Sequence, residues 1–481
     1  MKAPFSEYLA GIAPGLKELI ALLRERFDYV SVLSTDSVGF QTAISQKSKS
    51  VNRETMTTER GTVIRVYRDG LYSEAALTGF DPAAAAETRD RIIDELEAQF
   101  RLLKDAGIAP YETGKLPDEP RTIFAEMETG RLPEEEDLAA LVDRLSAISD
   151  RGMKEGAEQG IRMIDCVTRV SSTHISKMFL TENQDLRQSY VYSDGMIGAF
   201  VAGEDRTEMS YTSFSGRCGP ELFDGIDGKL GEAIRIGKDL LAADRVVPGE
   251  YDVITAPEVT GLIAHEAFGH GVEMDMFVKG RALGADYIGK RVGSDLVTMH
   301  EGALCAEDVT SYAFDDEGTP AGDVTEIENG ILRAGICDAL SALRLGTVPT
   351  GNGKRENFAH KVYTRMTNTM FDSGDSTLEE MIASIEKGYL LEGMQSGMED
   401  PKHWGIQCIL DRGYEIIGGK LTGKIVSPLV MTGYVPDLLG SVSMVSRDRE
   451  VFGAGACGKG HKEWVKVADG GPYLKAKVRL G

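Results

Sequence analysis

The tripeptide Val247-Pro248-Gly249 divides this sequence into two stretches of different character. Proline cannot continue a helix, so the helical pattern that starts at Pro220 must end by about Arg245. Helix-like and strand-like patterns alternate before this break, whereas glycine and short strand-like segments dominate after it. A chain of 481 residues is also too long for one typical hydrophobic core. We therefore expect two domains, residues 1–245 and residues 246–481.

The first stretch predicts a mixed domain of long helices and strands. Helical patterns cover residues 15–27, 82–104 and 133–154. Residues 160–215 have the alternation typical of strands, with a turn predicted at Ser193-Asp194-Gly195. Residues 110–120, which begin and end with proline, resemble a linker. The second stretch predicts a mostly β domain with a strong turn at Asp315–Pro320. The fold class expected for the whole chain is α+β.

The charge and the apolar pattern exclude two classes of partner. Acidic residues outnumber basic ones by 76 to 53, and the resulting formal charge of −23 repels a phosphate backbone. The apolar stretch from Leu19 to Leu23 is flanked by charged residues, as in an amphipathic helix and unlike a signal peptide. No apolar run is long enough to span a membrane. We expect a cytoplasmic protein that binds neither nucleic acid nor membranes.

The cysteines do not form a recognisable framework. Six of them are far apart, at positions 166, 218, 305, 337, 408 and 457, without any Cys-x-x-Cys pair. This spacing argues against a disulfide scaffold and against a zinc ribbon. A cysteine of this kind is usually a small buried hydrophobe, so any chemical role for one needs independent support.

The densest group of chemically active side chains lies between His265 and Asp275. Two imidazoles, His265 and His270, and three carboxylates, Glu266, Glu273 and Asp275, fall within this short segment. Imidazole binds zinc well at neutral pH, and a glutamate beside the first ligand can act as a general base on the water that zinc activates. The segment therefore indicates a zinc-dependent hydrolase. The alternative is two ordinary histidines beside a solvated acidic patch.

The spacing of the two histidines makes a geometric prediction. The second histidine follows the first by five positions, and on an ideal helix this spacing points the two side chains about 140° apart. Both imidazoles reach one metal only if the helix bulges or ends at the motif. Gly269 and Gly271, on either side of His270, supply the backbone freedom for such a departure.

A catalytic zinc also needs a third protein ligand and an open position. The residues themselves leave the choice open, and four candidates follow: Glu273, His300, Cys457 and His461. Cys457 lies in the glycine-rich run 453–460, where the backbone can approach other groups closely.

Several separate blocks resemble the TldD/PmbA family of metallopeptidases. These blocks, which follow one another in the family's order, are His265–Asp275, Asp315–Pro320, Thr350–Arg355, Arg365–Thr369 and Cys457–Lys459. They cover most of residues 250–460, whereas the N-terminal half is similar to the family only loosely, around Arg60–Gly70.

The resemblance implies a ligand set and a reaction. It makes His265, His270 and Cys457 the ligands of one Zn²⁺ per chain, with Glu266 as the catalytic general base. It also implies hydrolysis of unfolded or extended peptides by a dimer, either of identical chains or with a related family member. Members without the histidines are inactive partners, and this chain retains them.

Three further residues are weaker candidates for binding substrate: Arg365, Asn368 and His461. A structural role is an equal alternative for Arg365, because its neighbour Met366 is apolar. The chain departs from the family pattern around His461 and within residues 391–397. The natural peptide, its cleavage position and the choice between endopeptidase and exopeptidase activity therefore stay open.

Two other functions compete with peptide hydrolysis. The first is a peptide-binding or assembly subunit that pairs with a related chain and holds a structural metal in a closed site of four ligands. The second is a nucleic-acid-associated regulator, since the family has been described as a gyrase modulator, but the acidic charge opposes it.

Overall fold

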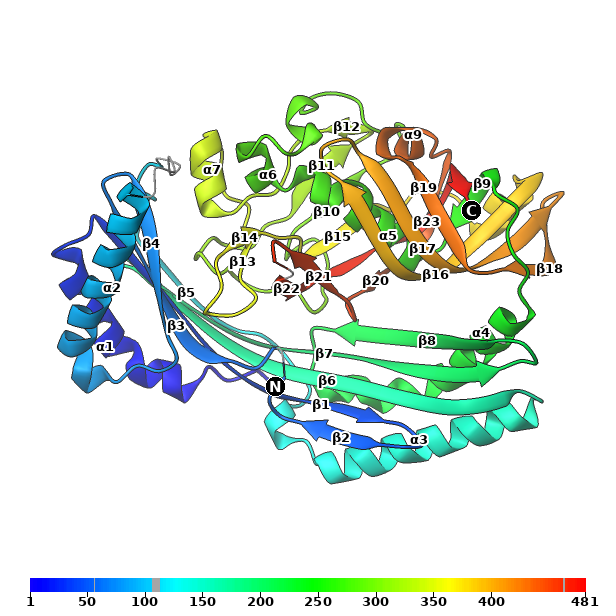
Figure 1. The fold of residues 1–481 in the computed structure, drawn as a ribbon, viewed down its shortest axis with the longest axis horizontal. Helices are drawn as coiled ribbons and strands as arrows, with labels where there is room; N and C mark the ends of the chain where they lie inside the picture. Colours follow the sequence, from blue (N-terminus) through cyan, green and yellow to red (C-terminus); the bar gives the residue numbers. More distant parts are fainter. Residues whose placement is uncertain (56, 106–112, 462) are drawn as a thin grey trace.

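A computed structural model describes residues 1–55, 57–105, 113–461 and 463–481 of the chain. Within these residues two large sheets dominate, and the fold is α+β as the sequence predicts. Figure 1 shows the N-terminal sheet as a layer with helix α3 below it and the C-terminal half above it. The strands of the N-terminal sheet lie between Tyr29 and Gly216, and those of the C-terminal sheet lie between Gly249 and Leu480. The division into two domains stays a prediction.

The N-terminal sheet has the strand order β4-β3-β1-β6-β7-β5, with β2 paired to β1 and β8 paired to β7. Its pairings are antiparallel except for the parallel pair of β5 and β7. The strands are β1 (Tyr29–Ile44), β2 (Lys49–Asn52), β3 (Arg60–Arg68), β4 (Leu71–Leu77), β5 (Arg121–Glu126), β6 (Arg162–Leu180), β7 (Gln184–Ala202) and β8 (Thr207–Gly216).

Four helices cover one face of this sheet: α1 (Glu7–Arg24), α2 (Ala85–Asp105), α3 (Leu138–Glu158) and α4 (Leu230–Ala242). The two-residue period of a strand explains why only one face is apolar. On β1, Val30 and Val32 pack beneath α1, and Phe40 packs with α3 further along the strand. The residues between them, such as Thr35 and Ser37, point to the opposite face, toward the C-terminal half.

Two local predictions need correction. Helix α1 starts at Glu7 and not near residue 15, because Pro14 is accommodated inside it while Leu9 and Ile12 are buried. The turn predicted at Ser193–Gly195 lies within β7, where a Cβ at Gly195 would meet the ring of Phe214. Part of the predicted linker, residues 110–112, lies outside the described residues, and residues 113–120 form neither helix nor strand.

The C-terminal half is mostly β, as predicted. Its sheet has the order β12-β11-β10-β15-β23-β19-β17-β16-β9, and β9 also pairs with β23, so five strands close into a ring. The strands are β9 (Gly249–Thr255), β10 (Met299–Glu301), β11 (Val324–Glu328), β12 (Ile331–Leu332), β15 (Asn368–Phe371), β16 (Lys387–Asp400), β17 (Gly405–Ile417), β19 (Leu429–Tyr434) and β23 (Ala468–Leu480). Two more, β18 (Lys420–Val426) and β20 (Met444–Phe452), pair with β17 and β23.

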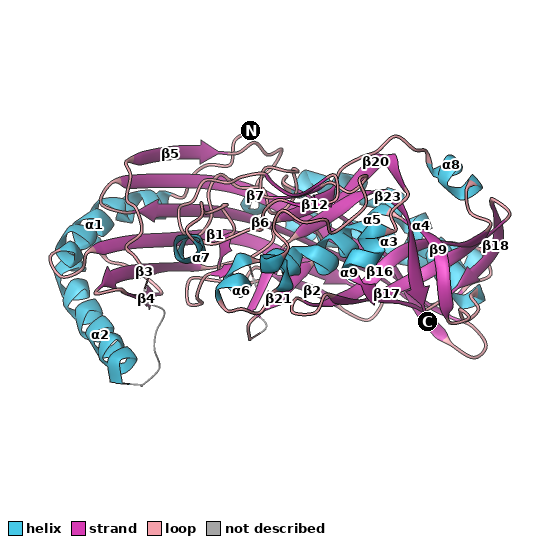
Figure 2. Ribbon diagram, turned by 90° about the horizontal axis from the view of Figure 1, so that it is seen from above, coloured by secondary structure: helices cyan, strands magenta, loops and turns pink. Residues whose placement is uncertain are grey.

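Short helices and two hairpins complete this half. The helices are α5 (Pro257–Ile263), α6 (Met274–Val278), α7 (Ala339–Leu345), α8 (Leu378–Ala383) and α9 (Val435–Gly440). The two-stranded sheets are β13 (Gly353–Lys354) with β14 (Tyr363–Thr364), and β21 (Ala456–Lys459) with β22 (Glu463–Lys466). Figure 2 shows α1 and α2 at one end of the molecule and β9, β16 and β18 at the other.

A cavity of about 550 Å³ lies between the polar face of the N-terminal sheet and the C-terminal half. We call the N-terminal side the sheet wall, and it includes Thr35, Ser37, Ser171, Lys177, Gln188, Tyr192 and Asp194. The side formed by residues 309–316, 354–356, 452–456 and 464–469 is the C-terminal wall. Among the described residues, no helix combines the length and apolarity needed to cross a membrane.

Candidate metal centre

The His265–Asp275 segment follows helix α5, which packs against β16 and β23. The helix does not stay regular: residues Ala264–Gly269 form a π-helical segment, and His270–Val272 form a 3₁₀ turn. The predicted departure from regular helix is therefore confirmed. The wider π turn brings together two histidines that an α-helix would point apart.

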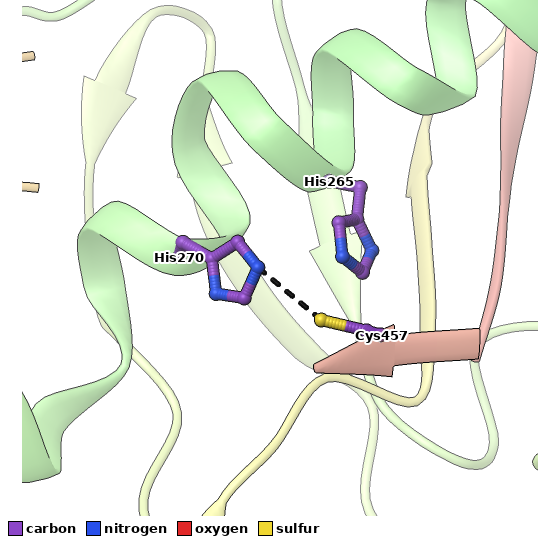
Figure 3. Close-up of side chains that lie close together, drawn as sticks. All are labelled: His265, His270 and Cys457. Atoms are coloured by element: carbon purple, nitrogen blue, oxygen red, sulfur yellow. Dashed lines mark hydrogen bonds between the residues drawn. The ribbon is translucent and has the colours of Figure 1, made fainter. Parts of the chain in front are cut away.

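The two histidines meet Cys457 from strand β21 (Figure 3). The imidazole rings of His265 and His270 are nearly perpendicular, with centroids 5.1 Å apart. The Sγ of Cys457 lies 3.3 Å from the Nε2 of His270, and one donor atom from each of the three residues lies within 4.8 Å of the others. No other group of this kind occurs in the described parts of the chain. The fold thus brings together the three residues that the family resemblance implies.

A buried carboxylate orients His270. Its Nδ1 lies 3.0 Å from Glu273 Oε2, and the Nζ of Lys459 lies 2.9 Å from the same oxygen and 2.7 Å from Asp275 Oδ1. Burial opposes the charge on Glu273, but Lys459 and His270 outweigh it and lower the pKa of Glu273 to about 2. With a metal bound, His270 would be neutral, would donate from Nδ1 to Glu273 and would offer Nε2 as the ligand.

Cys457 is the third donor, and its surroundings favour the thiolate. Burial alone would raise the pKa of the Cys457 thiol, but His265 and His270 lower it well below its usual value. The buried guanidinium of Arg365 fixes the hairpin that carries the cysteine, because its Nη2 donates to Cys457 O at 2.6 Å and its Nη1 to Glu463 O at 3.1 Å. A thiolate held in this way is a good zinc ligand.

His265 provides the test of whether this donor set fits zinc. Its Nδ1 is buried without a hydrogen-bond partner, 3.9 Å from Asp469 Oδ2, and Asp469 Oδ1 is also unpartnered. Burial raises the pKa of Asp469 to about 7, while His265 lowers it. An unsatisfied imidazole nitrogen, a thiolate and a second oriented imidazole form a set of soft and borderline ligands suited to Zn²⁺. The residues therefore fit the metal.

Glu266 is the third residue of the π-helical segment and lies against β16. A Cβ at Gly397 would overlap the Cγ of Glu266, so the missing side chain at that position makes room for it. The charge of Glu266 acts on both His265 and Asp469. The proposed general base is thus close to the ligands.

Glu399 is a second carboxyl group near the ligands, and sequence reasoning missed it. Both of its oxygens are buried without a hydrogen-bond partner, and it lies against Gly271. Burial raises its pKa to about 9, whereas His270 lowers it.

Other predicted residues lie elsewhere. His300 on β10 contacts Asp323 and Asp372, and His461 is exposed in the turn after β21. Asn368 is buried, and its side chain bonds Thr310, Ser311 and two backbone carbonyls. Like Arg365, it is buried and bonded within the protein and is not among the residues that line the cavity, and a role of these two residues in holding substrate stays a prediction.

Two functional neighbours also escaped the sequence reasoning. Asp469 has no sequence signal that links it to His265, because it lies on strand β23, far along the chain from the π-helical segment. Lys459 belongs to the Cys457–Lys459 block, and this block was the one sequence feature that could have pointed to its ion pair with Glu273.

Residues 248–478 match the family described as "PmbA/TldA metallopeptidase C-terminal domain". Residues 248–478 thus form a C-terminal domain of the TldD/PmbA family. A metalloprotease of Methanocaldococcus jannaschii is 34% identical over 236 residues, which are 49% of this chain and 51% of that protein. A zinc metalloprotease TldD homolog of Saccharolobus solfataricus is 32% identical over 232 residues, 48% of this chain and 51% of that protein. The aligned stretch thus spans about half the length of each of these relatives.

The whole fold also has a counterpart of known structure. TldE from Thermococcus kodakarensis superimposes with a TM-score of 0.77 and covers 97% of this chain and 100% of its own, at 18% sequence identity. At that identity the likeness concerns the fold alone. It extends the similarity to the N-terminal half, where the sequence resembles the TldD/PmbA family only loosely.

Proposed function

We propose that this protein is a zinc-dependent peptidase that hydrolyses unfolded or extended peptides. The observation that carries the proposal is the convergence of His265, His270 and Cys457 around one point beside Glu266. The relatives named metalloprotease and zinc metalloprotease support the metal and the reaction class. We also propose that it works in the cytoplasm as a dimer, of identical chains or with a related member.

In the proposed reaction His265, His270 and Cys457 would hold one Zn²⁺ per chain, which would supply Lewis acidity for the scissile carbonyl and the attacking water. The residues of the chain have separate tasks. Glu266 accepts the proton of the attacking water and passes it to the leaving amine. Glu273 and Lys459 hold His270 in one tautomer and orientation, and Arg365 holds the backbone of Cys457.

The cavity supports the choice of an extended substrate. It reaches the metal centre at Ala456, next to Cys457, and at Asp469, next to His265. It is enclosed between the sheet wall and the C-terminal wall, and its volume of about 550 Å³ suits a few residues of an extended chain better than a folded domain.

The competing function, an assembly subunit with a structural metal, requires a closed site of four ligands. In the described residues the ligand group consists of two histidines and one cysteine. Three ligands leave a position for substrate or water, which favours catalysis.

The decisive experiment measures hydrolysis of an unfolded protein such as reduced, denatured casein before and after chelation. The proposal predicts that chelation abolishes the activity, that added Zn²⁺ restores it, and that a folded protein of similar size is not cleaved. Full activity of the metal-free protein would sink the mechanism. Sedimentation that shows only single chains would count against the dimer.

A further inference from the structure

Lys354 is a cation on the C-terminal wall that the proposed reaction does not use. It forms β13 with Gly353 and pairs with Tyr363 on β14. It lies in the block Thr350–Arg355, between Gly353 and Arg355. Its side chain is half-buried and lines the cavity. A cationic side chain on the wall of the cavity is placed to select among substrates by their charge.

The ammonium group of Lys354 has protein partners but no counter-charge. Its Nζ donates to Lys466 O at 2.7 Å and lies 3.4 Å from Met366 O. No carboxylate of the described residues lies within salt-bridge distance of it, and two partners leave one of its three donors unused.

Three other cations that line the cavity are neutralised by carboxylates, and a fourth, Arg169, is exposed to solvent. Lys177 forms an ion pair with Asp316, Lys466 with Asp194 at 2.9 Å, and Arg355 with Glu74 at 2.5 Å. Buried or half-buried charges in proteins are normally paired in this way. Lys354 departs from that rule in the same cavity.

The missing counter-charge lowers the pKa of the Lys354 ammonium group. Burial, reinforced by the nearby charge of Arg365, lowers the pKa of Lys354 to about 7. Asp316 and Glu301 act in the opposite direction but do not compensate. An anion bound at the unused N–H donor of Lys354 would supply the negative charge that no carboxylate of the described residues provides.

Lys354 is also close to the metal centre along the wall. Lys466, whose carbonyl accepts its hydrogen bond, is the antiparallel partner of Ala456, and Ala456 precedes Cys457. A peptide bound at the metal centre and extending along the C-terminal wall therefore passes the Lys354 ammonium group.

We propose that Lys354 is a carboxylate-binding site that selects among the peptides entering the cavity. The inference rests on the proposed peptidase function and adds a substrate class to it: peptides with a carboxylate at a fixed distance from the scissile bond. That carboxylate is either the free C-terminus or an acidic side chain, and both make the same charge-assisted hydrogen bond.

The test measures binding of short alanine-rich peptides, labelled at the N-terminus, to the full-length chain carrying Glu266→Gln, so that bound peptide is not consumed. Three probes are compared: the free acid, its C-terminal amide, and amides with one glutamate at successive positions. We expect a carboxylate to strengthen binding about tenfold. Preference for the free acid identifies the C-terminus, and preference for one glutamate amide identifies a side chain.

Substitutions connect this preference to the residue. Lys354→Met should abolish it while leaving the affinity for the neutral amide unchanged, and Lys354→Arg should keep it. Lys387→Met removes the same charge from an exposed position on β16 and should change nothing. Equal binding of all probes, absence of binding, or an equal loss for the neutral amide in Lys354→Met would overturn the proposal.

Hydrolysis, measured separately with the unsubstituted chain, distinguishes the two proposals. A carboxylate preference that depends on Lys354 without any hydrolysis would refute the peptidase and leave the binding site standing. Hydrolysis without the preference would do the reverse.

Discussion

The two walls of the cavity are built in contrasting ways. The sheet wall consists of long antiparallel strands, and its polar side chains are satisfied: Gln188 bonds Phe314 O and Ala313 N, and Ser171 bonds Asp194. The C-terminal side is assembled from short strands and the π-helical segment behind them. There, His265 Nδ1 and Asp469 Oδ1 are buried without partners.

This difference indicates where binding and chemistry occur. On a polar surface whose side chains are all hydrogen-bonded within the protein, no group needs a ligand. A buried polar atom without a partner is costly, and a bound ligand can supply the missing interaction. His174 shows the same difference when it is compared with the histidines of the metal centre. On β6, both of its nitrogens have partners, Glu134 at 2.8 Å and Ser189 at 2.8 Å, which leaves no nitrogen for a metal. We therefore expect substitutions near the metal centre to affect catalysis and those in the sheet to affect stability.

The largest effect should follow from Glu266→Gln. Loss of the general base should lower kcat by roughly 10²–10⁴-fold without loss of zinc, because the three ligands remain. Steady-state kinetics and metal analysis of the same preparation check both parts. Turnover comparable to that of the unsubstituted chain would show that another group accepts the proton.

The second largest effect, on stability, concerns an ion-pair cluster at the contact between the N-terminal and C-terminal halves. Glu74 on β4 binds both Arg65 and Arg355, which outweigh the cost of burial and lower the pKa of Glu74 to about 2. Relative to the ordinary glutamate value this shift contributes about 3 kcal/mol of stability. Because the folded-state pKa is lowered, the contribution is complete above the unfolded pKa of about 4.5 and is lost as the pH falls toward about 2.

Glu74→Gln should therefore reduce the free energy of unfolding at neutral pH by about this amount, with zinc content unchanged. The difference from the unsubstituted chain should shrink steadily below about pH 4.5. Denaturant titrations over a range of pH measure it. A difference independent of pH would assign the loss to packing instead of charge.

A smaller effect is expected when the orientation of a ligand is disturbed. Glu273→Gln removes the charge that holds His270 and should weaken zinc binding by about 10–100-fold. Competition with a zinc chelator of known affinity measures the change. Glu134→Gln is the matched control, because it removes the same kind of carboxylate from His174. If both variants bind zinc equally well, Glu273 has no special role.

The smallest effect is expected when the space around Glu266, the proposed general base, is reduced. Gly397→Ala adds a methyl group that overlaps Glu266 and should lower kcat roughly tenfold while zinc affinity stays the same. Gly433→Ala, where a Cβ meets nothing within 4 Å, serves as the control. An unchanged kcat in Gly397→Ala would mean that Glu266 does not depend on its present position.

The sequence predicts the local parts of this structure better than the distant ones. The helical patterns and the break between His265 and His270 depend on neighbouring residues, and both were found. Cys457 lies 187 residues beyond His270, so only the family resemblance pointed to it. Asp469 and Glu399 could not be predicted, because their proximity to the ligands arises from strand packing. Gly195 misled the turn prediction, since glycine at that position makes room for Phe214.

The most direct test of the central claim is the zinc content of the Cys457→Ser variant. Zinc per chain should be measured for the unsubstituted protein, Cys457→Ser, and the control Cys408→Ser, whose thiol is buried on β17. We expect one zinc per chain in the first and third proteins, and loss of both zinc and hydrolysis in Cys457→Ser. Full zinc content and unchanged hydrolysis in Cys457→Ser would contradict it.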